Sequence, residues 1–464
     1  MLENIIYWSK QKKWLLLSLL FSGLLLLFPT PHGLEISGYR IIVIVILFIL
    51  LILFEPIPLP ATGMLIIVLQ VLFGIASPNE VASSFMSDSV FFIMGSLMLA
   101  IAIISQGLDS RLALAIINVT GHKTWKISFG FILFCALLSS FIGEHTVTAM
   151  MMPVGITLIR NTNANPKKNK KLSLLLLFSI AYGSAIGSIG TPSGGGRNVI
   201  MIGYLSQFGI AEVTYLEWMK YAYPILILQI PLTVIVLWTT FKPEKMILDS
   251  AVIKLKTKVS QSGKLSNKQV LAILIFIFIF FGWIFFSSTL GLGIISLIGV
   301  ILYLSFGLIE WRDLNKNTNW GVIILFGAAI SIGFQMKETG AAFWLANNFI
   351  EWVNSFSTNI NFSYSLISVI FTSSLTNFLS NAATIAVLGP IVINIGGDSL
   401  ILPMITALSS AFGYLTIVAS PSYMIIYSSG LVKSSDFLKG GWKMMIMSII
   451  LLLLFSNIIW PLFL

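Results

Sequence analysis

The chain has 464 residues, of which 57% are hydrophobic and only 9% are charged, and its formal net charge is +10. Soluble domains carry about 25% charged residues, so this composition excludes a soluble protein. Membrane β-barrels have short segments of alternating polarity, whereas the apolar runs here are long and continuous. The sequence therefore predicts an all-α polytopic membrane protein. A single cysteine, Cys135, and three histidines exclude a thiolate cluster and argue against a multi-histidine metal centre, and basic residues confined to loops argue against nucleic acid binding.

The first apolar run, at about 14–29, follows three lysines in the way that a signal peptide does. It lacks a cleavage site of small residues and many further spans follow, so we expect 1–36 to hold a retained N-terminal helix. Uninterrupted spans are predicted at 40–56, 60–76, 88–106, 220–240, 268–287, 290–309, 319–335 and 441–463.

Four other segments are apolar but interrupted. Residues 127–159 and 364–394 have polar residues near their middle, and each is predicted to form a re-entrant helical hairpin. Residues 172–203 and 399–430 begin as helices and then break at "GTPSGGGRN" and "ASPSY". A break at membrane depth leaves backbone groups that only protein, a ligand or a water-filled cavity can satisfy. We therefore expect two broken transmembrane helices that line a site.

Loop charge predicts the orientation in the membrane. Basic residues gather at 160–171 and 242–268, whereas the loops at 204–219 and 396–399 hold acidic residues and no basic one. The basic loops are expected to be cytoplasmic. This places the N-terminus in the cytoplasm and the C-terminus outside, in a multi-pass protein of the inner (cytoplasmic) cell membrane.

The two hairpins look like copies of one unit. "FIGEHTVTAMMMP" (141–153) aligns with "FLSNAATIAVLGP" (378–390) without a gap, and a helix starting "SAIG" or "SAFG" and a break follow each. The loop after the first hairpin is basic and the loop after the second is acidic, which indicates opposite orientations. We predict inverted-topology repeats at 37–241 and 269–464, joined by a basic cytoplasmic linker at 242–268, as in secondary transporters.

The candidate site consists of the hairpin tips and the helix breaks, where half-helix N-termini present N–H groups and a partial positive charge to an anion. Its predicted substrate- or ion-binding residues are Gly143, Glu144, His145 and Thr146 at the first tip; Ser380, Asn381, Ala382 and Thr384 at the second; Thr191, Pro192, Gly194, Arg197 and Asn198 at the first break; and Ser420, Pro421 and Tyr423 at the second.

These hairpins and breaks resemble those of the divalent anion/sodium symporters, which carry dicarboxylates, citrate or, in some branches, sulfate. The resemblance covers most of the chain after the first span and is clearest in "TAMMMP", "SIGTPSGGGRN", "LSNAAT" and "SPSYMIIYSSGLVKSSDF". It implies a secondary transporter of small organic or inorganic anions, without an enzymatic cofactor. It also implies two Na⁺ sites beside the substrate, a homodimer and elevator-type movement.

The chain departs from the pattern of that family at each site element. The family has Ser-Asn-Thr at its tips, whereas the first tip here reads Gly143-Glu144-His145 and the second ends in Ala382. Arg197 stands at a proline position of the first break, and the second break lacks the asparagine. Fewer oxygen ligands and a guanidinium weaken a cation site, so only a weak Na⁺ site near Ser380 and Asn381 is expected.

We therefore hypothesise that Arg197 supplies the positive charge that relatives recruit as Na⁺. It would pair with Glu144 in the empty protein and with an anionic substrate in the loaded one. Glu144 or His145 could then take up a proton. The coupling ion is thus Na⁺ or H⁺, with Na⁺-independent anion exchange as a further possibility.

Structural interpretations remain beside these functional ones. Arg197 could snorkel to an interface, Glu144 and His145 could simply close a hairpin, and Ser380 with Asn381 could cap a half-helix. The alternative function is a membrane enzyme or lipid-linked assembly factor that uses Glu144 and His145 as an acid/base pair. No nucleophile or triad spacing near the pair supports it, so we expect no enzymatic activity.

Overall fold

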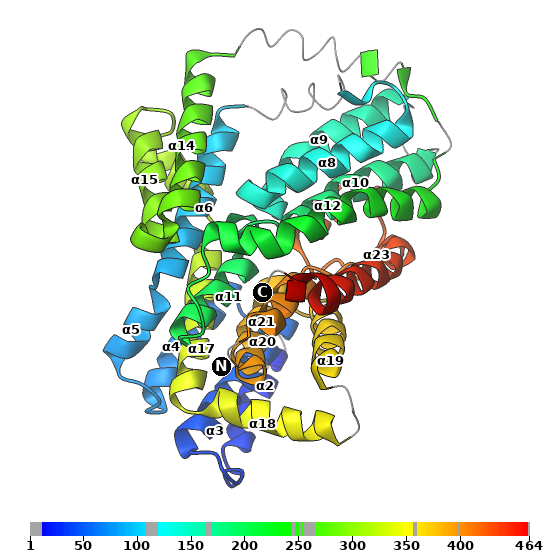
Figure 1. Cartoon of the computed structure of the whole chain (residues 1–464). Helices are drawn as coiled ribbons and strands as arrows, with labels where there is room; N and C mark the ends of the chain where they lie inside the picture. Colours follow the sequence, from blue (N-terminus) through cyan, green and yellow to red (C-terminus); the bar gives the residue numbers. More distant parts are fainter. Residues whose placement is uncertain are drawn as a thin grey trace, which may run out of the picture.

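The structure is a computed structural model of the chain (Figure 1). It describes residues 12–107, 119–162, 169–243, 246–249, 252–253, 265–355, 360–397 and 399–462. Within these ranges the regular structure is helical, apart from one isolated antiparallel bridge between Lys123 and Ile247. The predicted all-α class is confirmed.

Helices long and apolar enough to cross a membrane dominate the described chain. Eight segments qualify: Ile36–Phe54 (α3), Asp88–Ser105 (α6), Thr124–Ile142 (α8), Lys170–Gly187 (α10), Tyr215–Thr240 (α12), Asn267–Leu290 (α14), Trp320–Glu338 (α17) and Ser434–Leu462, which contains α23 (Ser434–Leu454). Shorter helices are Lys13–Leu25 (α2), Leu59–Leu72 (α4) and Leu292–Ser305 (α15). The polytopic character follows from these lengths, because about 20 apolar residues span a bilayer.

Burial separates the central helices from the peripheral ones. In α10, 89% of the membrane-spanning window is buried inside the protein, whereas in α14 the corresponding share is 22%. Helix α14 instead exposes a row of phenylalanines that includes Phe278, Phe281 and Phe285. An apolar exposed face of this kind suits contact with lipid acyl chains. Helix α10 is therefore a core element. It packs against α8, α12 and α9 (Glu144–Thr162), the second helix of the first hairpin.

Both predicted hairpins are present as helix pairs. Helix α8 ends at Ile142, and α9 starts at Glu144, so Gly143 alone joins them. Gly143 has φ of +85°, a conformation that costs glycine little and other residues more. The second pair is Ile360–Leu375 (α19) and Asn381–Gly396 (α20). The side chain of Ser380 caps α20 by accepting a hydrogen bond from Ala383 N at 3.3 Å.

Both predicted broken helices are present too, but the breaks differ from the predicted positions. After α10, a short 3₁₀ turn (Pro192–Gly194, η2) leads to Gly196–Gln207 (α11), so Arg197 and Asn198 lie in the first turn of α11. In the second half, eleven residues separate the end of Ile401–Ser409 (α21) from the start of Pro421–Ser428 (α22). The segment 410–420 is therefore non-helical, although its sequence is largely apolar.

This second break is tied to the second hairpin through Asn377, which bonds one backbone N–H and one side chain of the break. Asn377 Oδ1 accepts a hydrogen bond from Leu415 N at 2.8 Å, and Thr416 Oγ1 donates to the carbonyl of Asn377 at 2.6 Å. Gly413 packs so closely that a Cβ there would lie 3.0 Å from Thr376 O. These contacts come from another part of the chain, which explains why the local sequence placed the break ten residues too late.

Three helices were not predicted: Pro78–Phe85 (α5), Trp311–Asn317 (α16) and Ala341–Asn354 (α18). Helix α5 starts with a capping box, in which Ser77 and Glu80 bond each other's backbone N–H groups. All three are shorter than a membrane span, which is why a search for long apolar runs does not find them.

Part of the predicted linker at 242–268 is tied to the first hairpin. Thr124 N donates to Met246 O, and Leu248 N donates to His122 O, both at 2.9 Å. His122 Nδ1 also lies 2.7 Å from Asp249 Oδ1. Outside the described residues lie Lys167, Lys168, Lys245, Lys254, Lys256, Lys258, Lys264 and Asp398, which contributed to the predicted orientation.

The helices gather in groups around the breaks (Figure 1). Helices α8, α9, α10, α12 and α23 form one end of the molecule, and α6, α14 and α15 form one flank. Helix α11 packs against α20 from the second half and against α6 and α17. It thereby connects the two halves at the level of the breaks.

Candidate functional site

Glu144 lies where both hairpins and both breaks meet. It is the first residue of α9 and is 7% exposed. Its Oε1 accepts a hydrogen bond from Ser420 Oγ at 2.9 Å, and its Oε2 is 3.2 Å from Ser188 Oγ. The end of the Asn381 side chain, 237 positions away in the chain, lies 3.4 Å from Oε1 and donates a hydrogen bond to it only when the amide oxygen is turned away from Arg197. The tertiary structure therefore joins the four predicted site elements at one carboxylate.

Arg197 supplies the positive charge beside it. The side chain is 2% exposed and extends from the first turn of α11. Nη2 donates to Ser188 Oγ at 2.6 Å. In one orientation of the Asn381 amide, both its nitrogen and its oxygen have hydrogen-bond partners. In that orientation Asn381 Oδ1 accepts a hydrogen bond from Arg197 Nη1 at 3.2 Å. Nε has no hydrogen-bond partner among the described residues, so this buried guanidinium has unused donor capacity.

Arg197 and Glu144 form no direct ion pair within 4.0 Å; the described ion pairs lie elsewhere. Ser188 lies between them and also approaches Ala185 O at 2.6 Å, so its single hydrogen is shared between a carbonyl and a carboxylate. An isolated buried charge costs several kcal/mol, and two nearby opposite charges offset part of that cost. The pair is electrically neutral as a whole.

Two helix N-termini contribute a positive electrostatic potential at Glu144. It begins α9, and its partner Ser420 is the N-cap of α22. The unpaired N–H groups of a helix start favour a negative charge by about 0.3–1 kcal/mol each when exposed and by more when buried. The location therefore suits a carboxylate.

The first break satisfies its own carbonyl groups. Asn198 Nδ2 donates to the carbonyls of Ser188 and Thr191, both at 2.8 Å, and Thr191 Oγ1 donates to Ser140 O. A Cβ on Gly194 would lie 2.6 Å from Ser188 O and 2.9 Å from Ser140 O, so only glycine fits there. Three carbonyl oxygens at this break are thus already bonded to N–H and O–H donors, whereas Oδ1 of Asn198 is buried without a hydrogen-bond partner among the described residues and could still face a cation.

The second tip is similarly occupied. In the satisfied orientation, Asn381 Nδ2 donates to Thr376 Oγ1, Ser410 O and Ala419 O at 2.9–3.0 Å. Its Oδ1 then faces the guanidinium of Arg197, which repels a cation. Thr384 bonds back to Ser380 O at 3.1 Å. The residues expected to hold Na⁺ weakly are therefore a poor set of cation ligands in this arrangement.

The remaining predicted residues surround this centre without contacting Glu144 by a described hydrogen bond. His145 and Ala382 are half-buried, Thr146 is buried, Pro192 and Gly194 form the 3₁₀ turn, and Pro421 begins α22. Tyr423 is 1% exposed, and its hydroxyl has no described partner. Its ring packs edge-on against Tyr182 at a centroid distance of 5.6 Å. His145 lies farther than 4.0 Å from any described carboxylate, so the geometry does not form an acid/base dyad with Glu144.

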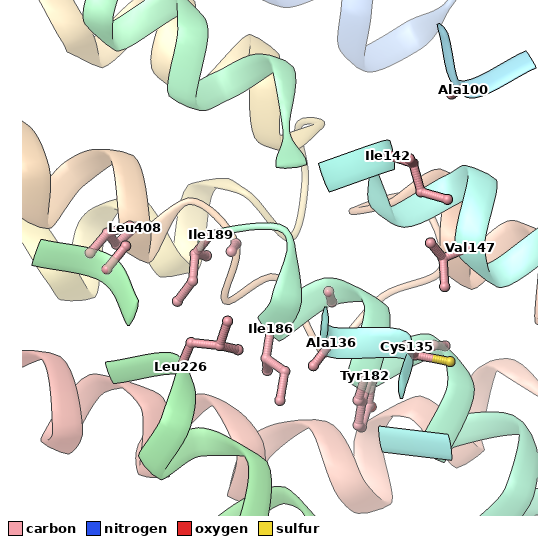
Figure 2. Packing of buried hydrophobic residues seen from close by; sticks show 14 of the residues in the cluster. Ala100, Cys135, Ala136, Ile142, Val147, Tyr182, Ile186, Ile189, Leu226 and Leu408 are labelled. Carbon is pink, nitrogen blue, oxygen red and sulfur yellow. The ribbon is translucent and has the colours of Figure 1, made fainter. Parts of the chain in front are cut away.

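Apolar packing holds the first break in place. Figure 2 shows Ile186 and Ile189, on either side of the end of α10, gathered near Leu226 of α12. On the other face, Gly187 is so close to the carbonyl of Ala136 that any side chain would overlap the backbone of α8. Close packing of this kind fixes the position of Ser188, the next residue.

Sequence reasoning missed Ser188, Ser140, Thr376 and Ser410. Ser188 lies three residues before Thr191 in "SAIGSIGTP", where a serine is also compatible with simple helix packing. Its place within a Gly-rich break was the available signal. Thr376 and Ser410 carried no local signal, because both act through their contact with Asn381.

Comparisons with known proteins show which transporters the chain is similar to. The family model described as sodium:sulfate symporter transmembrane region matches residues 9–464. The sodium-dependent dicarboxylate transporter SdcS of Staphylococcus saprophyticus is 27% identical over 97% of this chain and 92% of its own length. An uncharacterized transporter of Haemophilus influenzae is 26% identical, with 88% of each chain covered.

Two solved structures share the fold. The YdaH transporter of Alcanivorax borkumensis aligns with a TM-score of 0.56 over 85% of this chain and 90% of its own. The MtrF efflux pump of Neisseria gonorrhoeae aligns with a TM-score of 0.56 over 91% and 96%. Their identities of 12% and 10% limit the likeness to the architecture.

Proposed function

The chain belongs to the family of the sodium:sulfate symporter transmembrane region, and from that premise we propose that it carries small organic or inorganic anions across the cell membrane by secondary active transport. It is a transporter rather than an enzyme, as its family and relatives are. Di- and tricarboxylates are the first substrates to test, because the staphylococcal relatives are dicarboxylate transporters by name.

The buried guanidinium of Arg197 carries this proposal. It lies among two hairpin tips and two helix breaks, and it has a free Nε–H. An arginine binds a carboxylate or another oxyanion through its planar fork of donors. We assign the anion to this guanidinium and to the hydroxyl groups of Ser188 and Ser420.

Na⁺ is the first coupling ion to test, since the names of the staphylococcal relatives describe sodium dependence. Hydrogen bonds engage the carbonyls beside Asn198, and the amide oxygen of Asn381 faces the guanidinium of Arg197, so these oxygens are less available to a cation; Oδ1 of Asn198 has no partner among the described residues. We therefore propose that Arg197 contributes more to anion affinity than Na⁺ does. Proton coupling and anion exchange are the competing outcomes of the same test.

The matching hairpins and breaks support two inverted repeats, 37–241 and 269–464, as the basis of transport. We propose that the protein works as a homodimer with elevator-type movement of the hairpins and broken helices. The cytoplasmic N-terminus and external C-terminus remain predictions from loop charge. Cysteine-accessibility labelling at each end would test them.

Uptake into vesicles tests the function. Purified protein is reconstituted, and labelled succinate, citrate and sulfate are offered with and without a Na⁺ gradient or a pH gradient. We expect accumulation of at least one anion and a loss of tenfold or more in the Arg197→Gln variant. Arg312→Gln, an exposed arginine on α16, is the matched control and should transport normally. Normal uptake by Arg197→Gln would remove Arg197 from the mechanism, and no accumulation under any gradient would refute anion transport.

A further inference from the structure

The place that best fits an anionic group is already filled by the protein's own carboxylate. Glu144 takes one hydroxyl on each carboxylate oxygen, Ser420 on Oε1 at 2.9 Å and Ser188 on Oε2 at 3.2 Å. Ser188 in turn connects the carboxylate to the guanidinium of Arg197. These are the donors that a substrate carboxylate would need, because no cationic side chain lies within 4.0 Å of Glu144 among the described residues and Arg197 reaches it only through Ser188.

The charge balance makes simultaneous occupation unfavourable. Arg197 and Glu144 sum to zero, and both are almost fully buried. A second anion beside them would leave two negative charges against one positive charge in a region of low effective dielectric constant, where repulsion is strong. If the Glu144 side chain swings away as a substrate carboxylate enters, the charge beside Arg197 stays the same and the hydroxyl groups of Ser188 and Ser420 are bonded again.

We propose that Glu144 is a tethered competitor of the substrate, so that a substrate carboxylate binds by displacing the Glu144 carboxylate from Ser188 and Ser420, beside Arg197. This inference depends on the proposed function, because it concerns the same site. The exchange needs no covalent step. The measured affinity then reflects the difference in binding free energy between the substrate carboxylate and the Glu144 carboxylate at the same donors.

The inference also specifies the ligand group. The seat presents one hydroxyl to each of two oxygens, which matches a planar carboxylate. A tetrahedral oxyanion such as sulfate has four oxygens to satisfy, and the seat lacks donors for them. A carboxylate-bearing substrate is therefore expected to compete with Glu144 better than sulfate does.

Ligand binding to the purified full-length protein tests the proposal, because removal of Glu144 should increase, not decrease, the affinity for a carboxylate. Titration calorimetry with succinate, and separately with sulfate, is carried out on the unmodified protein, Glu144→Gln, Glu144→Asp and Glu338→Gln. Glu144→Gln removes the competing charge at nearly constant volume, so succinate should bind at least tenfold more tightly, with a smaller gain for sulfate. Glu338→Gln alters an exposed carboxylate near the end of α17 and should bind as the unmodified protein does.

Glu144→Asp keeps the charge but shortens the side chain by one methylene, which withdraws it from Ser420 and Ser188. It should compete less well and also tighten succinate binding, and it decides the matter if Glu144→Gln does not fold. Equal or weaker succinate binding in the folded variants would overturn the inference while leaving the function intact. If no variant and no unmodified protein bound or accumulated any anion, the proposed function itself would fail.

Discussion

Arg197 and Glu144 are two buried, oppositely charged residues that approach each other only through a shared hydroxyl. Arg197 Nη2 lies 2.6 Å from Ser188 Oγ, and Glu144 Oε2 lies 3.2 Å from the same atom. The two residues that were expected to pair therefore contact each other only indirectly, through Ser188. An indirect contact leaves the guanidinium with donors for another partner, which a bidentate ion pair would have consumed.

Substitution of Ser188 tests this bridge. Ser188→Ala removes a partner from both buried charges, so we expect a loss of about 1–3 kcal/mol in the free energy of unfolding and weaker anion binding. Thermal unfolding in detergent and ligand titration measure the two effects. Ser173→Ala is the control, because this buried serine on α10 only bonds back to Asn169 O and should change stability by less than about 0.5 kcal/mol. Similar losses for both serines would contradict a special role for Ser188.

A charge-conserving change at Arg197 separates charge from geometry. Arg197→Lys keeps a positive charge, but one ammonium cannot bond Ser188 and Asn381 in the directions of the two guanidinium nitrogens. We expect anion affinity to fall about tenfold, equivalent to about 1.4 kcal/mol, with less loss than in Arg197→Gln. Uptake rates across substrate concentrations give the result. An affinity equal to that of the unmodified protein would show that charge alone is sufficient.

Tyr204 fastens α11 to its neighbours. Its hydroxyl donates to Ala329 O on α17 at 2.7 Å and approaches Ala386 O on α20 at 3.2 Å. The ring occupies the space beside Gly333, where any side chain would overlap it. Gly333→Ala should therefore lower the unfolding free energy by about 1–3 kcal/mol or more through overpacking.

The matched control for that change is Gly23→Ala. A Cβ on Gly23 meets nothing within 4 Å, and this helical glycine of α2 has no positive φ. Alanine is favoured over glycine inside a helix by about 1 kcal/mol, so stability should be unchanged or slightly higher. Thermal unfolding of both variants decides the comparison. A stable Gly333→Ala protein would show that the Tyr204 ring can move aside.

Asp88 caps a neighbouring helix across the bundle. Its two carboxylate oxygens accept hydrogen bonds from Leu292 N and Gly293 N at the start of α15, each at 3.1 Å. Asp88→Ala should lower the unfolding free energy by about 1–2 kcal/mol through loss of this cap. Asp88→Asn keeps one acceptor oxygen and should lose about half as much. Equal thermal stability of all three proteins would show that the contact contributes nothing.

Much of the fold could be predicted because membrane spans are local features. A run of about 20 apolar residues must form a helix in a bilayer whatever surrounds it. For this reason the expected spans correspond to α3, α6, α12, α14 and α17 to within a few residues at most ends. The helices α5, α16 and α18 are too short for a search for long apolar runs to find, although α5 has a local capping box, and the second break depends on contacts with the distant Asn377.

The candidate site divides in the same way. Charged and glycine-rich stretches inside apolar runs indicated Glu144 and Arg197, because such residues are costly in a membrane unless they have partners. The partners themselves carried weaker signals. Ser188 is an ordinary helix residue until the end of α10 places it between two charges.

The sequence by itself determined that this protein is a bundle of membrane helices with two polar hairpins and two broken helices, since hydrophobicity and backbone breaks act over a few residues. Only the tertiary structure decided which polar atoms meet. Ser420 and Glu144 are 276 residues apart in the chain yet 2.9 Å apart in space. Hydrogen bonds act over about 3 Å, so their partners are chosen by how the helices pack rather than by the residues beside them.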